Sequence, residues 1–336
     1  MNSTLKFLFQ PLLSTSLFSS LSTLLVALIL LSASPSIFAK ENTSPDPLAS
    51  YPIQKIAKHT WAIFGPKETP NEANQGFMNN PAFVVTDKSV VVFDPGSSVH
   101  IGKSLITKIK KVTDKPITHV FNSHIHGDHW LATDAIQLAY PDVVVYAHPV
   151  MLEEAKAGEG DSWIKLMSSL TAGATDGTKV VLPTRVLEDQ QVVRIDNISI
   201  KSHLSELSHT KTDAMFQIIE EKILITGDNS FNQRMPRMDD GSFVGNIQSM
   251  ENALGLDIEQ VIPGHGPLGG KEILSAYKDL LSIVYKEVKV QLDEDLEAFE
   301  MKPIIIEKLD SHKGWTNFED SIGKLISIAV LEAESE

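Results

Sequence analysis

The stretch Asn122-Ser123-His124-Ile125-His126-Gly127-Asp128-His129 decides the fold of this chain. It follows the apolar run 117–121, which is rich in β-formers and predicts a strand. Three histidines and one aspartate then lie within six residues. Ligand-binding loops of α/β proteins gather at the carboxyl ends of strands. The stretch therefore predicts a chemical site at a strand end, followed by a helix that begins at Asp128.

The spacing of these side chains indicates metal binding. In an extended segment His124 and His126 point the same way, so both imidazoles can reach one cation. Asp128 and His129 are adjacent and diverge, so they need a second cation or a reacting water beside the first. Imidazole and carboxylate ligands suit zinc, and iron and manganese are also possible.

The composition excludes several classes of function. The chain has 336 residues, of which 42% are hydrophobic and 21% charged, as in ordinary globular proteins. It has no cysteine, which excludes disulfides, thiolate–zinc sites, iron–sulfur clusters and cysteine nucleophiles. The formal net charge is −14, with no basic block, so we expect no nucleic-acid partner.

The first residues predict export. Residues 1–39 contain one charged side chain, Lys6, and a short apolar run followed by small residues, which is typical of a secretory signal peptide. We expect cleavage after Ala39, a linker over 40–50, and a periplasmic or secreted protein without membrane association. A longer apolar stretch, 21–33, would instead serve as an uncleaved anchor.

The remaining chain alternates strand-like and helix-like segments. Strands are expected over 53–56, 60–64, 82–85, 90–93, 117–121, 143–147, 192–195, 198–203, 214–219, 223–226 and 260–262. Helices are expected from a cap at Ser97 or Ser98 to about 112, over 128–139 and 163–170, and from Lys271 onward. Because several strands follow each other directly, the pattern favours an α/β fold with mixed sheets.

The pattern His124-x-His126-x-Asp128-His129 resembles the signature of the metallo-β-lactamase superfamily. Four further segments resemble its other motifs, in the family's order: Asp94-Pro95-Gly96, Ser208-His209-Thr210-Lys211-Thr212-Asp213, Thr226-Gly227-Asp228-Asn229 and Pro263-Gly264-His265-Gly266. The resemblance covers about 53–266 and implies a four-layer αβ/βα sandwich. The expected domains are the hydrolase fold over 51–270 and a helical C-terminal extension over 271–336.

The resemblance also implies a site and a reaction. It places His124, His126 and His209 on a first metal ion, Asp128, His129 and His265 on a second, Asp228 between the two, and Asp94 behind the ligands as an orienting group. With two zinc ions, such a site uses a metal-bridging hydroxide to cleave an ester, thioester, amide or phosphoester bond of a small molecule. Asp128 would orient this hydroxide or shuttle its proton.

Differences from particular subfamilies narrow the range of functions that the resemblance implies. The largest lactamase subclass has Cys where this chain has Asp228, which disfavours lactamase activity as the main role. The segments 77–81, 121–130 and 234–241 are similar to secreted zinc hydrolases associated with quinoprotein and sulfur-oxidation systems. Arg234 and Arg237 in the last segment are candidates for binding an anionic group of the substrate, or for surface salt bridges.

Two other functions are consistent with the same residues. A mononuclear iron oxygenase of the persulfide-dioxygenase type uses two histidines and one aspartate, which this chain also contains. The third possibility is a non-catalytic metal-binding module. The remaining histidines match no ligand motif and are expected to be packed or at the surface: His59, His100, His119, His148, His203 and His312. His148 follows a strand end and could also approach the site, and Trp130 is expected in the core or the pocket wall.

Overall fold

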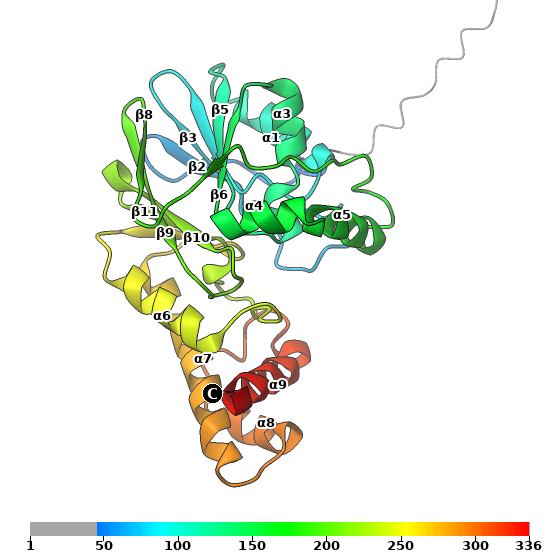
Figure 1. Ribbon diagram of the computed structural model, residues 1–336, viewed down its shortest axis with the longest axis vertical. Helices are drawn as coiled ribbons and strands as arrows, with labels where there is room; N and C mark the ends of the chain where they lie inside the picture. The colour runs from blue at the N-terminus through cyan, green and yellow to red at the C-terminus, as the bar shows by residue number, and fades with distance from the viewer. Residues whose placement is uncertain (1–45, 336) are drawn as a thin grey trace, which may run out of the picture. The chain divides into compact units, whose positions relative to one another are not determined.

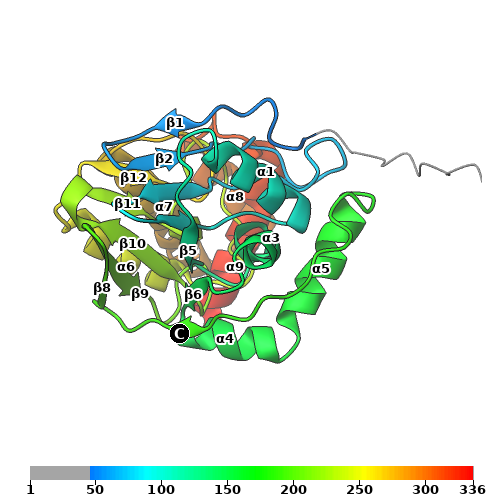
Figure 2. The same ribbon diagram turned by 90° about the horizontal axis from the view of Figure 1, so that it is seen from above.

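The computed structural model describes residues 46–335, in which two β-sheets lie face to face between helices (Figure 1; Figure 2). The predicted signal peptide, 1–39, and the first part of the predicted linker, 40–45, lie outside the described residues. Within the described part of the chain, no helix is both long and apolar enough to cross a membrane.

The first sheet has seven strands in sequence order, antiparallel from β1 to β4 and parallel from β4 to β7. They are β1 (Gln54–Lys55), β2 (Thr60–Ala62), β3 (Ala82–Val85), β4 (Val90–Phe93), β5 (Ile117–Phe121), β6 (Val144–Ala147) and β7 (Arg185–Val186). The sheet is therefore mixed, as the directly successive strands predicted.

The second sheet has five strands in the order β12-β11-β10-β9-β8, and only β11 and β12 run parallel. Its strands are β8 (Val192–Ile195), β9 (Ile198–Leu204), β10 (Ala214–Ile218), β11 (Ile223–Ile225) and β12 (Gln260–Ile262). Two short 3₁₀ turns, η1 (Ile219–Glu221) and η2 (Gly227–Asn229), flank β11.

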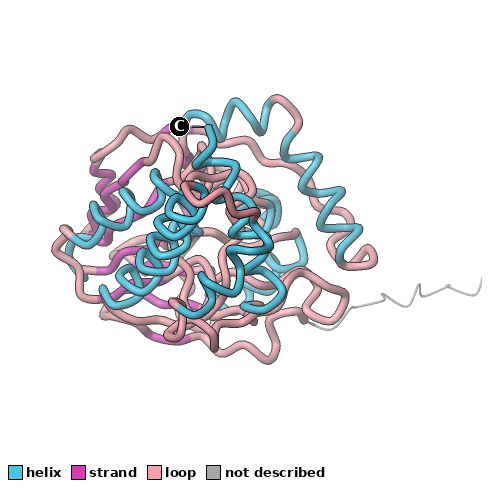
Figure 3. Tube along the Cα trace, turned by 90° about the horizontal axis from the view of Figure 1, so that it is seen from below, coloured by secondary structure: helices cyan, strands magenta, loops and turns pink. Residues whose placement is uncertain are grey.

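Some helices cover the outer faces of the two sheets, and the helices nearest the C-terminus pack on one another (Figure 1). The helices are α1 (Val99–Ile109), α2 (Gly127–Trp130), α3 (Thr133–Ala139), α4 (Pro149–Lys156), α5 (Glu159–Leu170), α6 (Phe243–Leu254), α7 (Lys271–Leu292), α8 (Ala298–Glu307) and α9 (Phe318–Ser335). Seen from below, helices lie in front of the strands (Figure 3). The helical C-terminal region confirms the expectation for the residues after Lys271.

Alternation along the strands explains the four layers. In β4, Val90 and Val92 join the apolar cluster that packs against α1 and α3, whereas Val91 and Phe93 face the second sheet. In β11, Leu224 turns the opposite way and joins the cluster formed with α6 and α7. The central strands of each sheet thus bury both faces, which is why β3, β4 and β11 are continuous apolar runs. The result is the predicted helix–sheet–sheet–helix sandwich (Figure 2).

Three local predictions need correction. The single helix expected over 128–139 is divided into α2 and α3, because the chain turns at Leu131–Ala132, where the Ala132 N–H donates to Gly96 O (2.8 Å). Helices α4 and α6 were not expected. The helix expected to reach about residue 112 ends at Ile109, although Ser98 caps its start as predicted, with its Oγ accepting from Ile101 N–H at 3.3 Å.

Candidate metal centre

The predicted ligands converge because each follows the end of a strand. The β5 strand leads into the loop that carries His124 and His126, and α2 begins directly after it. His209 lies between β9 and β10, Asp228 in η2 after β11, and His265 after β12. All the predicted ligands are buried.

The ligands form two groups, each of which could hold one metal ion. The first contains His124, His126, His209 and Asp228, and the second contains Asp128, His129 and His265. In each group, one ligand atom from every member lies within 4.8 Å of the others. The family resemblance implied the same division of the ligands into two groups.

Ring nitrogens face one another inside both groups. His126 Nδ1 and His209 Nε2 lie 3.0 Å apart, and His129 Nε2 and His265 Nε2 lie 3.4 Å apart. His124 Nε2 is buried without a hydrogen-bond partner. Buried polar atoms are costly when nothing satisfies them. Lone pairs that converge in this way fit a cation, so the residues present suit the metal ions that the resemblance implies.

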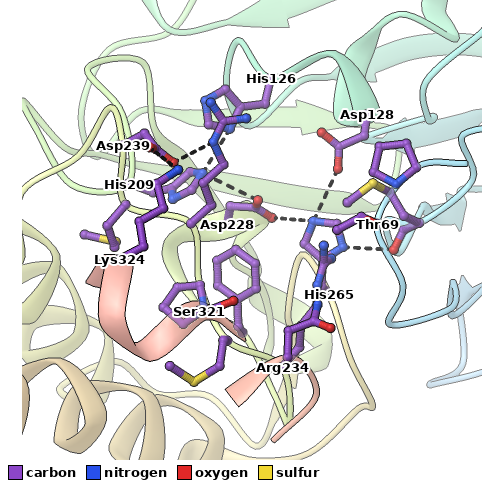
Figure 4. A pocket seen from close by; sticks show the side chains of 18 of the residues that line it. Thr69, His126, Asp128, His209, Asp228, Arg234, Asp239, His265, Ser321 and Lys324 are labelled. Atoms are coloured by element: carbon purple, nitrogen blue, oxygen red, sulfur yellow. Dashed lines mark hydrogen bonds and ion pairs between the residues drawn. The ribbon is translucent and has the colours of Figure 1, made fainter. Parts of the chain in front are cut away.

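Asp228 lies between the two groups with one oxygen toward each (Figure 4). Its Oδ1 lies 3.0 Å from His129 Nε2 and 3.2 Å from His265 Nε2. Its Oδ2 lies 3.5 Å from His209 Nε2 and 3.9 Å from His124 Nε2. This orientation is the one required of a carboxylate shared by two ions.

A hydrogen-bonded set behind the ligands fixes two of the imidazoles. Asp94 Oδ2 accepts from His129 Nδ1–H at 2.9 Å and from the Ser123 hydroxyl at 2.7 Å. Ser123 Oγ in turn accepts from His124 Nδ1–H at 2.9 Å. The far nitrogen of each ring thus carries the proton, and the near nitrogen presents its lone pair to the group. Asp94 therefore stands where the sequence placed it, behind the ligands.

Two further orienting groups were not predicted. His126 Nε2–H donates to Asp240 Oδ2 at 3.1 Å, and His265 Nδ1–H donates to the backbone oxygen of Met78 at 2.8 Å. Asp240 lies in the segment 234–241, in which only Arg234 and Arg237 were candidates from the sequence. A backbone carbonyl such as that of Met78 has no signal in the sequence.

The electrostatic environment favours a cation in the second group. Burial alone lowers the pKa of a histidine, but the carboxylates of Asp228, Asp128 and Asp94 raise the pKa of His129 well above its usual value. A metal ion would provide this positive charge in place of the proton. In the first group, burial lowers the pKa of His209 to about 3, so its imidazole is neutral and can ligate.

Two glycines allow the strand ends to approach this closely. Gly227 has a φ of +51°, and a Cβ there would lie 2.4 Å from Ser123 Oγ. A Cβ on Gly264 would lie 2.1 Å from Asp228 Oδ1. Any side chain at either position would displace the carboxylate or its supporting loop.

A cavity of about 420 Å³ opens onto both groups (Figure 4). His126, Asp128, His209, Asp228 and His265 form its polar floor. Its walls come from α5, from the loop after η2 and from α9, so the C-terminal helices contribute to the pocket. Arg234 and Arg237 both line it, as their place after Asp228 led us to expect.

Two residues outside the ligand set, His148 and Trp130, make contacts that support the fold. His148 caps α4, where its Nδ1 accepts from the Val150 N–H at 3.1 Å, and it does not line the cavity. Trp130 is fully buried in the core, and its Nε1–H donates to Ile125 O at 2.7 Å. The hydrogen bond holds the loop between His124 and His126 against α2.

Comparison with known proteins agrees with this geometry. The family model of the metallo-beta-lactamase superfamily matches residues 75–265. The chain is 24% identical over 197 residues to a probable metallo-hydrolase of Streptococcus pyogenes serotype M6, and the match covers 56% of this chain and 79% of that protein.

Solved structures share the fold. A metallo-beta-lactamase from Pontibacter korlensis has a TM-score of 0.57 at 18% identity, covering 69% of this chain and 99% of that one. A stereoselective inverting sec-alkylsulfatase from Pseudomonas sp. has a TM-score of 0.67 at 15% identity, covering 83% of this chain and 50% of that one.

Proposed function

The chain belongs to the metallo-beta-lactamase superfamily, a superfamily of metallo-hydrolases, and we propose that it is a dinuclear zinc hydrolase. The observation that carries the proposal is the pair of buried ligand groups with Asp228 between them. Two groups favour two ions over the single iron of an oxygenase. The substrate is a small molecule with an ester, thioester, amide or phosphoester bond, which the cavity of about 420 Å³ accommodates.

The chain's own residues would position the reactants. Bound zinc supplies Lewis acidity and a water of lowered pKa. Asp128 Oδ2 is buried without a hydrogen-bond partner and lies 3.3 Å from His265 Nε2, at the floor of the cavity. Although burial raises the pKa of a carboxyl, His129 and His265 hold the pKa of Asp128 well below its usual value. Asp128 is therefore ionised at neutral pH and can accept a proton from the attacking water.

Metal analysis and a substrate panel test this function. The full chain, produced with zinc and then with iron in the medium, is analysed for bound metal and assayed on esters, thioesters, amides, phosphoesters and sulfate esters. We expect about two zinc ions per chain, and hydrolysis that a chelator abolishes and zinc restores. One bound iron with oxygen uptake would overturn the proposal in favour of an oxygenase. A filled site without turnover on the whole panel would overturn it in favour of a binding module.

The proposed place of action is the periplasm or the cell exterior. The support is the composition of residues 1–39, which resembles a secretory signal. Mass spectrometry of the exported protein should find an N-terminus near Lys40. An intact Met1 in the membrane fraction would support the anchor instead.

A further inference from the structure

Arg234 is a buried charge without a partner. Its side chain lies in the cavity wall, and the residue is only 6% exposed. Its Nε and Nη1 atoms are buried and have no hydrogen-bond partner, and within the described residues the guanidinium forms no ion pair. A guanidinium presents up to five donors in a planar fork. Burial lowers the pKa of Arg234, and the carboxylates of Asp228, Asp128 and Glu68 offset part of this effect without forming an ion pair with it. Because a buried charge is costly without a direct acceptor, the guanidinium is suited to bind one.

The other two basic side chains of the cavity wall, Arg237 and Lys324, already have a carboxylate partner. Arg237 Nε lies 2.8 Å from Asp239 Oδ2, and Lys324 Nζ lies 2.5 Å from Asp239 Oδ1. Their side chains are 52% and 63% exposed, and the Arg237 guanidinium also lies 5.8 Å from the ring of Trp163. The sequence offered no reason to prefer one arginine over the other. In the structure Arg237 has a carboxylate partner, whereas Arg234 has none and can bind an anion.

About half of the residues that line the cavity are apolar, although Thr69, Asn317 and Ser321 also contribute to its wall. The apolar members include Trp163, Leu166 and Leu170 of α5 and Leu325 and Ile328 of α9. Leu166 and Leu170 line the cavity and are 40% and 44% exposed, so part of their apolar surface is in contact with water. A hydrocarbon group that covered them would be stabilised by the removal of this surface from water.

We propose that the substrate of this hydrolase is an amphipathic anion, whose carboxylate- or sulfonate-like group binds Arg234 and whose hydrocarbon part lies against α5 and α9. The proposal rests on the proposed function, since the same cavity reaches Asp128, Asp228 and His265 and so brings the scissile bond to the metal centre. An oxyanion has several acceptor oxygens, and hydrogen bonds from a guanidinium to an oxyanion are stronger than those between neutral groups, so such a group would supply the acceptors that Arg234 lacks.

The first experiment measures binding without turnover. Octane-1-sulfonate, octan-1-ol and ethanesulfonate are titrated calorimetrically into the zinc-loaded full chain, since none of them has a bond that the hydrolase would cleave. Hydrogen bonds to a charged group correspond to about a tenfold gain or more, so octane-1-sulfonate should bind at least about tenfold more tightly than the alcohol. It should also bind at least about tenfold more tightly than ethanesulfonate, which lacks the hydrocarbon part. Equal affinity for the sulfonate and the alcohol would overturn the proposal.

Variants attribute the binding to Arg234. Arg234→Met should remove the preference for the sulfonate, whereas Arg237→Met should change affinity less than about threefold, because Asp239 already pairs with Arg237. Arg234→Lys keeps the charge but loses the fork, and should fall between the wild type and Arg234→Met. A sulfonate that binds Arg234→Met as tightly as the wild type would show that it binds the metal ions, and would overturn the proposal.

Stability provides a second readout. Replacing a buried, unpaired charge with an apolar side chain of similar volume should stabilise the fold, so Arg234→Met should unfold at a higher denaturant concentration than the wild type. A lower midpoint would show that Arg234 has a structural role and would count against the proposal. The zinc content should stay the same in all variants. Because these measurements need no turnover, they distinguish a wrong substrate class from a wrong reaction.

Discussion

The replacement Asp228→Asn tests the dinuclear centre most directly. The carboxylate directs Oδ1 toward the second group, 3.0 Å from His129 Nε2, and Oδ2 toward the first, 3.5 Å from His209 Nε2. Asparagine keeps the shape but has only one oxygen and no charge. Two dications held close together would then lose the anion that screens their repulsion. We expect the zinc content to fall from about two ions per chain toward one.

The expected magnitude follows from the position of Asp228 among the ligands. Removing a group that only orients a ligand costs about 10–100-fold in metal affinity. Asp228 faces both groups itself, so the loss for the second ion should be at least about 100-fold, or about 2.7 kcal/mol. The first group should keep its ion longer. Burial lowers the pKa of His209 in the first group to about 3, so no proton competes there with the metal. In the second group, the surrounding carboxylates raise the pKa of His129, so a proton can compete with the metal.

The assay is metal analysis after dialysis against buffered free zinc, with affinities from chelator competition. The matched control is Asp257→Asn, the same chemical change at a carboxylate that is 80% exposed and pairs only with Lys222 in the described structure. It should keep both ions. Two zinc ions bound to Asp228→Asn with the affinity of the wild type would refute the bridging role.

Three further replacements are informative. Asp128→Asn should lower the turnover rate by about 10²–10⁴ with the fold intact, as steady-state kinetics and circular dichroism would show. Asp240→Ala removes the acceptor 3.1 Å from His126 Nε2, and should weaken zinc binding by about 10–100-fold in chelator competition. Burial lowers the pKa of His203, whose Nδ1 accepts from Gln190, so stability falls as the pH drops below about 6.5 because the unfolded chain binds the proton first. His203→Gln should lose less stability than the wild type between pH 7.5 and 5.5 in urea titrations.

The sequence predicted several strands well, and most of these are buried on both faces, although β8 is largely exposed. The runs 82–85, 90–93, 117–121, 192–195 and 260–262 match observed strands at both ends. Most of them consist of β-branched or aromatic residues bounded by turn formers, so pattern and packing agree.

The sequence did not predict helix α6, because the face of this helix that is buried is partly polar. Asn246 is fully buried there, with Nδ2–H donating to Ser208 Oγ and to Asn229 O. An apolar stripe at helical spacing is therefore interrupted at the position that faces the core. Only the tertiary contacts explain why the asparagine is buried.

The predicted ligands could be found because strand ends leave a local signal. Histidine and aspartate beside glycine, after an apolar run, mark such a position from the sequence alone. The groups that orient and surround the ligands leave a weaker signal, since Asp240 and Met78 O act from loops far along the chain. Their roles depend on how the two sheets pack, which local pattern does not encode.

The metal centre and the cavity wall come from partly different parts of the chain. The ligands and the carboxylate between them lie within residues 75–265, the segment that the superfamily model matches. Helix α9 lies outside that segment, yet Ser321, Lys324, Leu325 and Ile328 form part of the cavity wall. Membership of the superfamily therefore indicates how a bond is broken, because the strand ends are shared. In the site proposed for the substrate, α5 and Arg234 lie within the segment 75–265 and α9 outside it, so changes in α9 would alter substrate specificity while the metal centre stays the same.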